Sequence, residues 1–251
     1  MWLVLLIWVV VIFVSTLVIS QYMKMQKRED VAIAFYILFI TMSQILAVKI
    51  GDFSLGSYQI TAPVAVLIFP FTFQITDMVN ENFGRKRTHR MIFIAFVTQI
   101  LMAVFIWFSI EIPGAPFWGL NWGSNPTEAQ NFWLNFFGST IRITIASWIS
   151  FIITENLDAV LFAKLKKLTG GKNLWIRNIF SDIPTLALDS LIFVSIAFGG
   201  LLDIWPIIWG QLLTKWFFGV IDTPFMYLSR GIINGKINIL GNLFGKHEEN
   251  K

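Results

Sequence analysis

Long apolar runs alternate with short polar segments along the whole chain. At about 1.5 Å per residue, a helix of some twenty residues spans the roughly 30 Å hydrocarbon core of a bilayer. Seven runs meet this length: residues 1–23, 31–50, 62–83, 91–110, 139–163, 176–200 and 204–228. We expect Pro70 to kink the third of them, because proline removes a backbone hydrogen bond inside a helix. The pattern predicts an all-α, polytopic membrane bundle of about seven transmembrane helices.

The polar segments between the runs differ in charge. Lys and Arg are concentrated in residues 24–30, 84–90, 164–177 and the tail at 231–251. Neither residue type occurs in residues 51–61, 111–138 or 200–203. By the positive-inside rule, the N-terminus lies outside the cell membrane and the C-terminus inside. The long uncharged segment at 111–138, rich in Pro, Gly and Trp, is expected to be a loop at the membrane interface.

Composition supports a multi-pass protein of the cell membrane and narrows the chemistry. The 251 residues are 56% hydrophobic and 14% charged, with a mean hydropathy of +0.68, whereas soluble domains average about 25% charged residues. The chain has no cysteine, and its two histidines, His89 and His247, lie in a loop and in the tail. We therefore expect no metal site and no cofactor. The predicted division is an N-terminal helix and basic loop (1–30), a six-helix core (31–230) and a polar cytoplasmic tail (231–251).

A short pattern of Thr, Asp and Phe at four-residue spacing occurs twice, 31 residues apart. The two copies are Thr154, Asp158, Phe162 and Thr185, Asp189, Phe193. In the predicted topology the first copy runs from outside to inside and the second runs back. Inverted repeats around a site within the membrane are typical of secondary transporters.

Ionisable side chains also occur within the runs, where each costs about 2.5–3.5 kcal/mol on insertion scales. The candidates are Asp77, Glu81, Arg142, Glu155, Asp158, Asp182, Asp189, Lys215 and Asp222. Their helical spacing aligns them with other polar residues: Gln74, Ser147, Ser150, Thr154, Thr185 and Gln211. Polar stripes of this kind face a protein interior or water rather than lipid. Four helices thus direct polar groups toward a common space, which predicts a binding cavity or solute pathway.

Structural roles are open for some of these residues. Glu81 is close enough to the basic loop at 84–90 to pair with it. Thr154 and the two serines on its helix face have the small polar side chains of helix-packing residues. Asp189 and Lys215 can form a structural ion pair.

Several blocks of the chain resemble the queuosine precursor transporters, also described as vitamin uptake transporters. These blocks are Phe69-Pro70-Phe71-Thr72-Phe73, Asp77, Asn80-Glu81 and Gly84-Arg85-Lys86; Gly171-Lys172, Leu174-Trp175-Ile176-Arg177-Asn178 and Ser181; Asp189-Ser190, Phe193 and Ile196-Ala197-Phe198-Gly199-Gly200; and Lys215, Thr223-Pro224 and Tyr227. The resemblance covers about residues 31–230. It implies a helical membrane protein that imports 7-deazaguanine precursors used in tRNA modification. The chain departs from the family at Glu155 and Leu186, where relatives commonly have glutamine.

A 7-deazaguanine base is flat and has adjacent N–H donors on its Watson–Crick edge, so a buried carboxylate can accept two hydrogen bonds from it. We predict that Glu155 or Asp189 reads this edge and that Lys215 balances the second carboxylate. The candidate substrate-binding residues are Asp77, Glu81, Thr154, Glu155, Asp158, Thr185, Asp189, Phe193, Lys215 and Asp222. The expected partners are this small molecule and the lipid bilayer, with no nucleic acid.

The energy source stays open at this stage. Gly171-Lys172-Asn173 lacks the glycine loop and the hydroxyl of a nucleotide-binding P-loop, so the chain is not expected to hydrolyse ATP. Uniport, proton coupling through a carboxylate, and action as the substrate-binding subunit of an ATP-driven vitamin importer are all compatible with the sequence, as is a homo-oligomer. We do not expect an enzyme. An intramembrane aspartyl site formed by the two repeat aspartates is the distant alternative.

Overall fold

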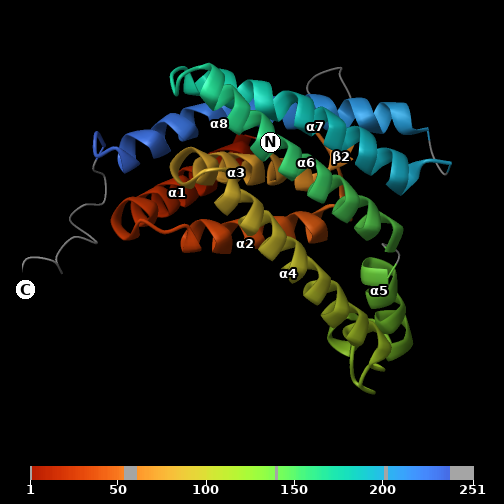
Figure 1. Ribbon diagram of the computed structural model, residues 1–251. Helices are drawn as coiled ribbons and strands as arrows, with labels where there is room; N and C mark the ends of the chain where they lie inside the picture. Colours follow the sequence, from red (N-terminus) through yellow and green to blue (C-terminus); the bar gives the residue numbers. More distant parts are fainter. Residues whose placement is uncertain (1, 54–60, 139–140, 201–202, 238–251) are drawn as a thin grey trace, which may run out of the picture.

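The computed structural model describes residues 2–53, 61–138, 141–200 and 203–237 and is dominated by helices (Figure 1). The α-helices are α1 (Trp2–Gln26), α2 (Asp30–Leu46), α3 (Phe69–Phe83), α4 (Arg85–Glu111), α5 (Pro126–Gly138), α6 (Ile141–Leu168), α7 (Leu174–Phe198) and α8 (Ile204–Ile233). Between α2 and α3 lie an antiparallel pair of strands, β1 (Ile50–Asp52) and β2 (Thr61–Pro63), and a 3-10 helix, η1 (Val64–Leu67). A second 3-10 helix, η2 (Leu120–Trp122), precedes α5.

The predicted membrane bundle is confirmed. Five helices, namely α1, α4, α6, α7 and α8, are long and apolar enough to cross a bilayer, and α2 is a shorter apolar helix of 17 residues. Many large apolar side chains on the outer faces of α1, α4 and α8 are exposed, as expected for surfaces that contact lipid. The chain is therefore a multi-pass membrane protein. Of the predicted tail, residues 238–251, including His247, lie outside the described residues.

The third predicted run is not one kinked helix, and that expectation was wrong. Residues 61–67 form β2 and η1, and α3 begins only at Phe69, with Pro70 in its first turn. Proline suits the first turn because the amide it lacks has no helical partner there. Pro70 thus starts the helix rather than bending it.

The short helix α3 is the centre of the bundle. All residues from Pro70 to Asn80 are buried, and α3 packs against α2, α4, α6, α7 and α8. Its 15 residues extend about 22 Å, which is less than the thickness of the hydrocarbon core. The mostly buried β2 and η1 continue the chain on one side, where surrounding helices shield the irregular backbone from lipid.

The N-terminal helix α1 packs as part of the bundle. The Trp8 ring lies 4.8 Å from that of Phe218 in α8, and the Trp8 indole donates to the Leu67 carbonyl. Further along α1, the Ser20 hydroxyl donates to that of Ser229 at 2.8 Å. These contacts tie α1 to α8 and η1 along most of its length.

The segment predicted as an interfacial loop contains the helix α5, so the expectation of an irregular loop was wrong. Asn125 and Glu128 form a capping box: the Glu128 amide donates to Asn125 Oδ1 at 2.9 Å, and the Asn125 amide donates to Glu128 Oε2 at 3.3 Å. A hydrogen bond from Ser124 and the backbone bond from Asn125 lower the pKa of the Glu128 carboxyl. This local signal, with Pro126 as the first helical residue, starts a helix despite the aromatic and glycine-rich composition around it.

Helices α4 and α5 extend away from the rest of the bundle (Figure 1). The far end of α4 is joined to α5 by two hydrogen bonds, from Gln130 Nε2 to the Ile110 carbonyl at 2.9 Å and from Trp133 Nε1 to Ser109 Oγ at 3.0 Å. Only 22% of the most apolar stretch of α4 is buried within the protein. The outer half of α4 therefore presents most of its surface to lipid.

The two repeat copies lie on α6 and α7, which pack antiparallel with the copies facing each other. The Thr185 hydroxyl lies 3.4 Å from Asp158 Oδ1, as an antiparallel repeat requires. The equivalent partner of Asp189 would be Thr154, but Ser150, one turn earlier, takes that place and donates to Asp189 Oδ1. The predicted repeat is therefore visible as contacts between the copies, although its symmetry is broken by one turn.

Contacts bring the basic segments to one end of the bundle. Arg87 pairs with Glu29 at 2.7 Å, and Arg230 at the end of α8 donates to the Gly171 carbonyl at 3.2 Å. Lys166 and Arg177, from the third basic segment, both pair with Glu81. This one-sided arrangement agrees with the predicted orientation of the protein in the membrane.

We predict that Trp8→Ala destabilises the bundle by about 3 kcal/mol, because it removes a buried ring and its hydrogen bond. Thermal unfolding of the detergent-purified protein measures the change. The matched control is Trp209→Ala, at a side chain that is 57% exposed on the outside of α8. Equal melting temperatures for the two variants would show that α1 does not stabilise the bundle.

Candidate functional site

The bundle contains a cavity on the half opposite the basic segments. Its walls come from α2, β2, η1, the start of α3, and the facing sides of α6, α7 and α8. The empty space within and in front of it is about 510 Å³, a volume that includes its open mouth. Three phenylalanines, Phe69, Phe151 and Phe193, give it an aromatic wall.

An ion pair between α7 and α8 lies in the cavity wall. Lys215 Nζ donates to Asp189 Oδ2, and Ser150 Oγ donates to the other carboxylate oxygen at 2.5 Å. The Lys215 ammonium also lies 4.8 Å from the centre of the Phe69 ring. Both charged side chains are about 95% buried. Because each charge has its partner, the pair places polar groups at the cavity without leaving net charge in the membrane interior.

Neutral polar groups complete the cavity wall. Gln211 of α8 is 2% exposed, and its side-chain oxygen has no hydrogen-bond partner among the described residues. Gln44 of α2 and Ser147 of α6 also line the space. The cavity thus combines a flat aromatic side with donors and acceptors at several positions, as in sites for planar polar molecules.

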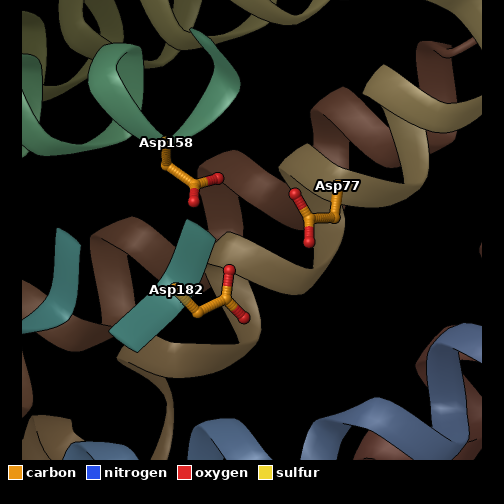
Figure 2. A group of neighbouring side chains, drawn as sticks. All are labelled: Asp77, Asp158 and Asp182. Atoms are coloured by element: carbon orange, nitrogen blue, oxygen red, sulfur yellow. The ribbon is translucent and has the colours of Figure 1, made fainter. Parts of the chain in front are cut away.

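A second polar feature, which we call the acidic layer, lies toward the basic end of the bundle. It consists of Asp77 of α3, Asp158 of α6 and Asp182 of α7, whose carboxylates point toward one another (Figure 2). One oxygen from each lies within 4.8 Å of the others. Asp158 is eight residues beyond Ser150, so the layer is about 12 Å further along α6 than the Asp189–Lys215 pair.

Hydrogen bonds satisfy only part of the acidic layer. Asp182 accepts from Asn178 Nδ2 at 2.6 Å and from Ser181 Oγ at 3.1 Å. Asp158 Oδ1 accepts from the Thr185 hydroxyl at 3.4 Å, and its carboxyl group also interacts with Ser181 and with the carboxyl group of Asp182. Both oxygens of Asp77 are without a partner among the described residues, as are both oxygens of Asp222 on α8, which is close enough to act electrostatically on Asp182.

Glu155 lies between the cavity and the acidic layer. It is fully buried and accepts hydrogen bonds from Thr72 Oγ1 at 2.9 Å and from Thr76 Oγ1 at 3.4 Å. The neighbouring Thr154 hydroxyl donates to the Ser150 carbonyl within its own helix. Neither residue lines the cavity.

Glu81 lies at the basic end, in a network of cations. It pairs with Arg177 at 2.6 Å and with Lys166 at 3.1 Å, and Arg230 is 3.9 Å away. The Arg177 side chain is fully buried, and its guanidinium lies 5.5 Å from the centre of the Phe162 ring. Glu81 therefore joins α3 to α6, α7 and α8.

The structure thus distributes the ten candidate residues over four places. Asp189, Phe193 and Lys215 line the cavity; Asp77, Asp158, Thr185 and Asp222 belong to the acidic layer or its surroundings; Glu155 and Thr154 lie between the two; and Glu81 is in the basic network.

Several cavity residues, among them Gln44, Phe69 and Phe151, were not predicted as site residues. Gln44 could have been noticed from the adjacent polar pair it forms with Ser43 in an otherwise apolar run. Phe69 had no signal of its own before α3 was known to start there. Ser147 and Gln211 were recognised as parts of polar stripes but not as cavity residues.

Comparison with known proteins identifies a matching family and two relatives of the chain. Residues 63–229 match the model of a family described as "Putative vitamin uptake transporter". A Bacillus subtilis protein named "Probable queuosine precursor transporter" is 23% identical over 180 residues, which cover 70% of this chain and 75% of that protein. A Haemophilus influenzae protein of the same name is 27% identical over 220 residues, covering 79% and 84%. No solved structure matches the chain.

We predict that Glu81→Met destabilises the protein by about 3 kcal/mol, because it leaves the buried Arg177 guanidinium without a carboxylate. Arg177→Met alone should cost less, since Glu81 keeps Lys166 as a partner. The double variant Glu81→Met/Arg177→Met should recover at least half of the Glu81→Met loss.

Thermal unfolding of the four proteins gives the coupling between the two positions. Glu111→Met, at an exposed carboxylate on the end of α4, is the matched control and should change stability by no more than about 0.5 kcal/mol. Additive effects of the two substitutions would contradict the assigned pairing.

Proposed function

Since this chain belongs to the family described as "Putative vitamin uptake transporter", we propose that it carries a queuosine precursor, a 7-deazaguanine base, across the cell membrane. Two relatives are named as transporters of such a precursor. The cavity of this chain supports the proposal, because its wall contains aromatic rings and a carboxylate. A flat base with adjacent N–H donors needs both.

Asp189 is the residue proposed to read the Watson–Crick edge. An ionised carboxylate has about four lone-pair positions, so Asp189 can keep its bonds to Lys215 and Ser150 and still accept from a base. Lys215 holds the carboxylate in position and balances its charge. This assignment prefers Asp189 over Glu155, because Asp189 lines the cavity and Glu155 is covered by Thr72 and Thr76.

The remaining contacts follow from the other cavity residues. The free side-chain oxygen of Gln211 is an acceptor for a further N–H of the base, and the amide groups of Gln211 and Gln44 can donate to its carbonyl. Phe69 and Phe193 provide faces on which the ring can stack. Glu155 is the next carboxylate toward the basic end, so a base leaving the cavity in that direction meets it first.

We predict that Asp189→Asn lowers uptake of a labelled 7-deazaguanine precursor at least about tenfold, because an amide replaces one acceptor by a donor. Phe193→Leu should lower uptake several-fold through the loss of a stacking face. The assay uses vesicles reconstituted with the purified chain alone, so uptake there also separates self-sufficient transport from a requirement for an ATPase module.

Phe180→Leu is the matched control for Phe193→Leu, because Phe180 lies on the same helix with its side chain 59% exposed. Reconstituted amounts and melting temperatures of all variants are compared with those of the unchanged protein. Unaltered uptake by both Asp189→Asn and Phe193→Leu would disprove the proposed binding site.

Competition measures the chemical preference of the cavity. Guanine and 7-deazaguanines present adjacent N–H donors on one edge, whereas adenine does not. We expect the guanine-edge compounds to inhibit uptake at concentrations at least about tenfold lower than adenine. If Asp189 hydrogen-bonds that edge, the residual uptake by Asp189→Asn should no longer be inhibited preferentially by guanine-edge compounds. If the preference is preserved, another residue binds that edge.

A further inference from the structure

The acidic layer and its surroundings combine four carboxyl groups that have no ion-pair partner among the described residues. Asp77, Asp158, Asp182 and the nearby Asp222 are each at least 97% buried. Within the described parts of the chain, every Lys or Arg in an ion pair bonds another carboxylate, and Arg177, the partner of Glu81, acts on Asp77 only through longer-range electrostatic attraction. Adjacent buried carboxylates repel one another strongly in a low dielectric. Protons or a bound cation must therefore reduce this repulsion.

The carboxylate oxygens that have no hydrogen-bond partner show where a positively charged ligand would bind. Neither oxygen of Asp77 and only one oxygen of Asp158 has a partner among the described side chains. Asp77 is fully buried, and its carboxylate points toward those of the other two aspartates (Figure 2). The donors around the layer, from Asn178, Ser181 and Thr185, bond other oxygens. A buried acceptor without a donor is costly and calls for a ligand.

We propose that Asp77, Asp158 and Asp182 bind one hard metal cation between α3, α6 and α7. Three oxygens no more than 4.8 Å apart can share an ion at about 2.8 Å or less from each, close to the 2.3–2.6 Å of calcium–oxygen bonds. Ligands that are all oxygen select Na⁺, Mg²⁺, Ca²⁺ or Mn²⁺ over metals that prefer nitrogen and sulfur. The expectation of no metal rested on the scarcity of His and Cys, and it did not consider carboxylates from three separate helices.

The bound cation joins α3, α6 and α7, which among the described residues are otherwise linked by charge only through Glu81, one turn beyond Asp77. Asp182 lies seven residues before the cavity residue Asp189, which places both on the same face of α7, about 10 Å apart along its axis. The cation therefore fixes the helix that also carries the cavity ion pair. This site involves no substrate, so it stands or falls independently of the proposed transport function.

The test is thermal unfolding of the purified full chain after removal of divalent ions with EDTA and exchange into choline chloride. Na⁺, Mg²⁺, Ca²⁺ and Mn²⁺ are then added separately at constant ionic strength. We expect at least one of them to raise the melting temperature saturably, by about 5 °C at a concentration one hundredfold above its dissociation constant. Asp77→Asn and Asp158→Asn should each abolish the rise.

Asp203→Asn is the matched control, because Asp203 is an exposed cap at the start of α8, where asparagine also caps well. It should retain the full rise. A rise that persists in both Asp77→Asn and Asp158→Asn would contradict the proposal.

Direct binding keeps the proposal testable if the asparagine variants fold poorly. Electron paramagnetic resonance of added Mn²⁺ counts bound ions on the unchanged protein, and competition with the other three cations ranks them. The expected result is one displaceable ion per chain. Neither bound Mn²⁺ nor a thermal shift with any of the four cations would mean that protons alone neutralise the layer, and the proposal would be wrong.

Discussion

Charge buried in a low-dielectric interior is the constraint on which this bundle depends. Each ionisable group within the membrane needs a partner, and the chain meets this need differently at three depths. At the basic end, Glu81 gathers cations from three helices. At the cavity, Asp189 and Lys215 neutralise each other one to one. Between them, the acidic layer has carboxylates from three helices and no ion-pair partner among the described side chains. The helices that carry these groups are thereby fixed against one another more specifically than apolar packing alone could achieve, because lipid is as apolar as the helix surfaces.

The cavity itself follows from the way the third apolar run is divided. Had residues 62–83 formed one helix, side chains of that helix would fill the space between α2, α6 and α8. Instead, Pro70 starts α3 late, and the narrower strand and 3-10 segment before it leaves room. Ala65, Val66 and Phe69, from that segment and the start of α3, form part of the wall. Irregular backbone next to a binding site is a feature of many transporters, and it is tolerated here because surrounding helices shield it from lipid.

Much of the architecture could be predicted from the sequence, because hydrophobic length and the placement of Lys and Arg report directly on membrane spans. The ion pair between Asp189 and Lys215 was one of the roles that the sequence left open, and the opposite directions of the two repeat copies followed from the predicted topology. Spacing along one helix, however, gives only the face on which a residue lies. It does not give the depth or rotation of the neighbouring helix, so the meeting of Asp77, Asp158 and Asp182 could not be foreseen. The start of α3 at Phe69 and the helix α5 were missed because local capping, by proline in one case and by the Asn125–Glu128 box in the other, outweighed the composition of the longer segment.

The broken symmetry of the repeat explains how one motif serves two environments. Because Ser150 rather than Thr154 pairs with Asp189, the second copy places its aspartate at the cavity, beside Lys215. The first copy places Asp158 in the acidic layer, against Thr185 of the other copy. Helix α7 contributes to both places through Asp189 and Asp182 on a single face. A rigid-body displacement of α7 along its axis would therefore change both at once. A proton or cation bound in the acidic layer is therefore linked to the cavity residues through the backbone of α7, which carries both Asp182 and Asp189.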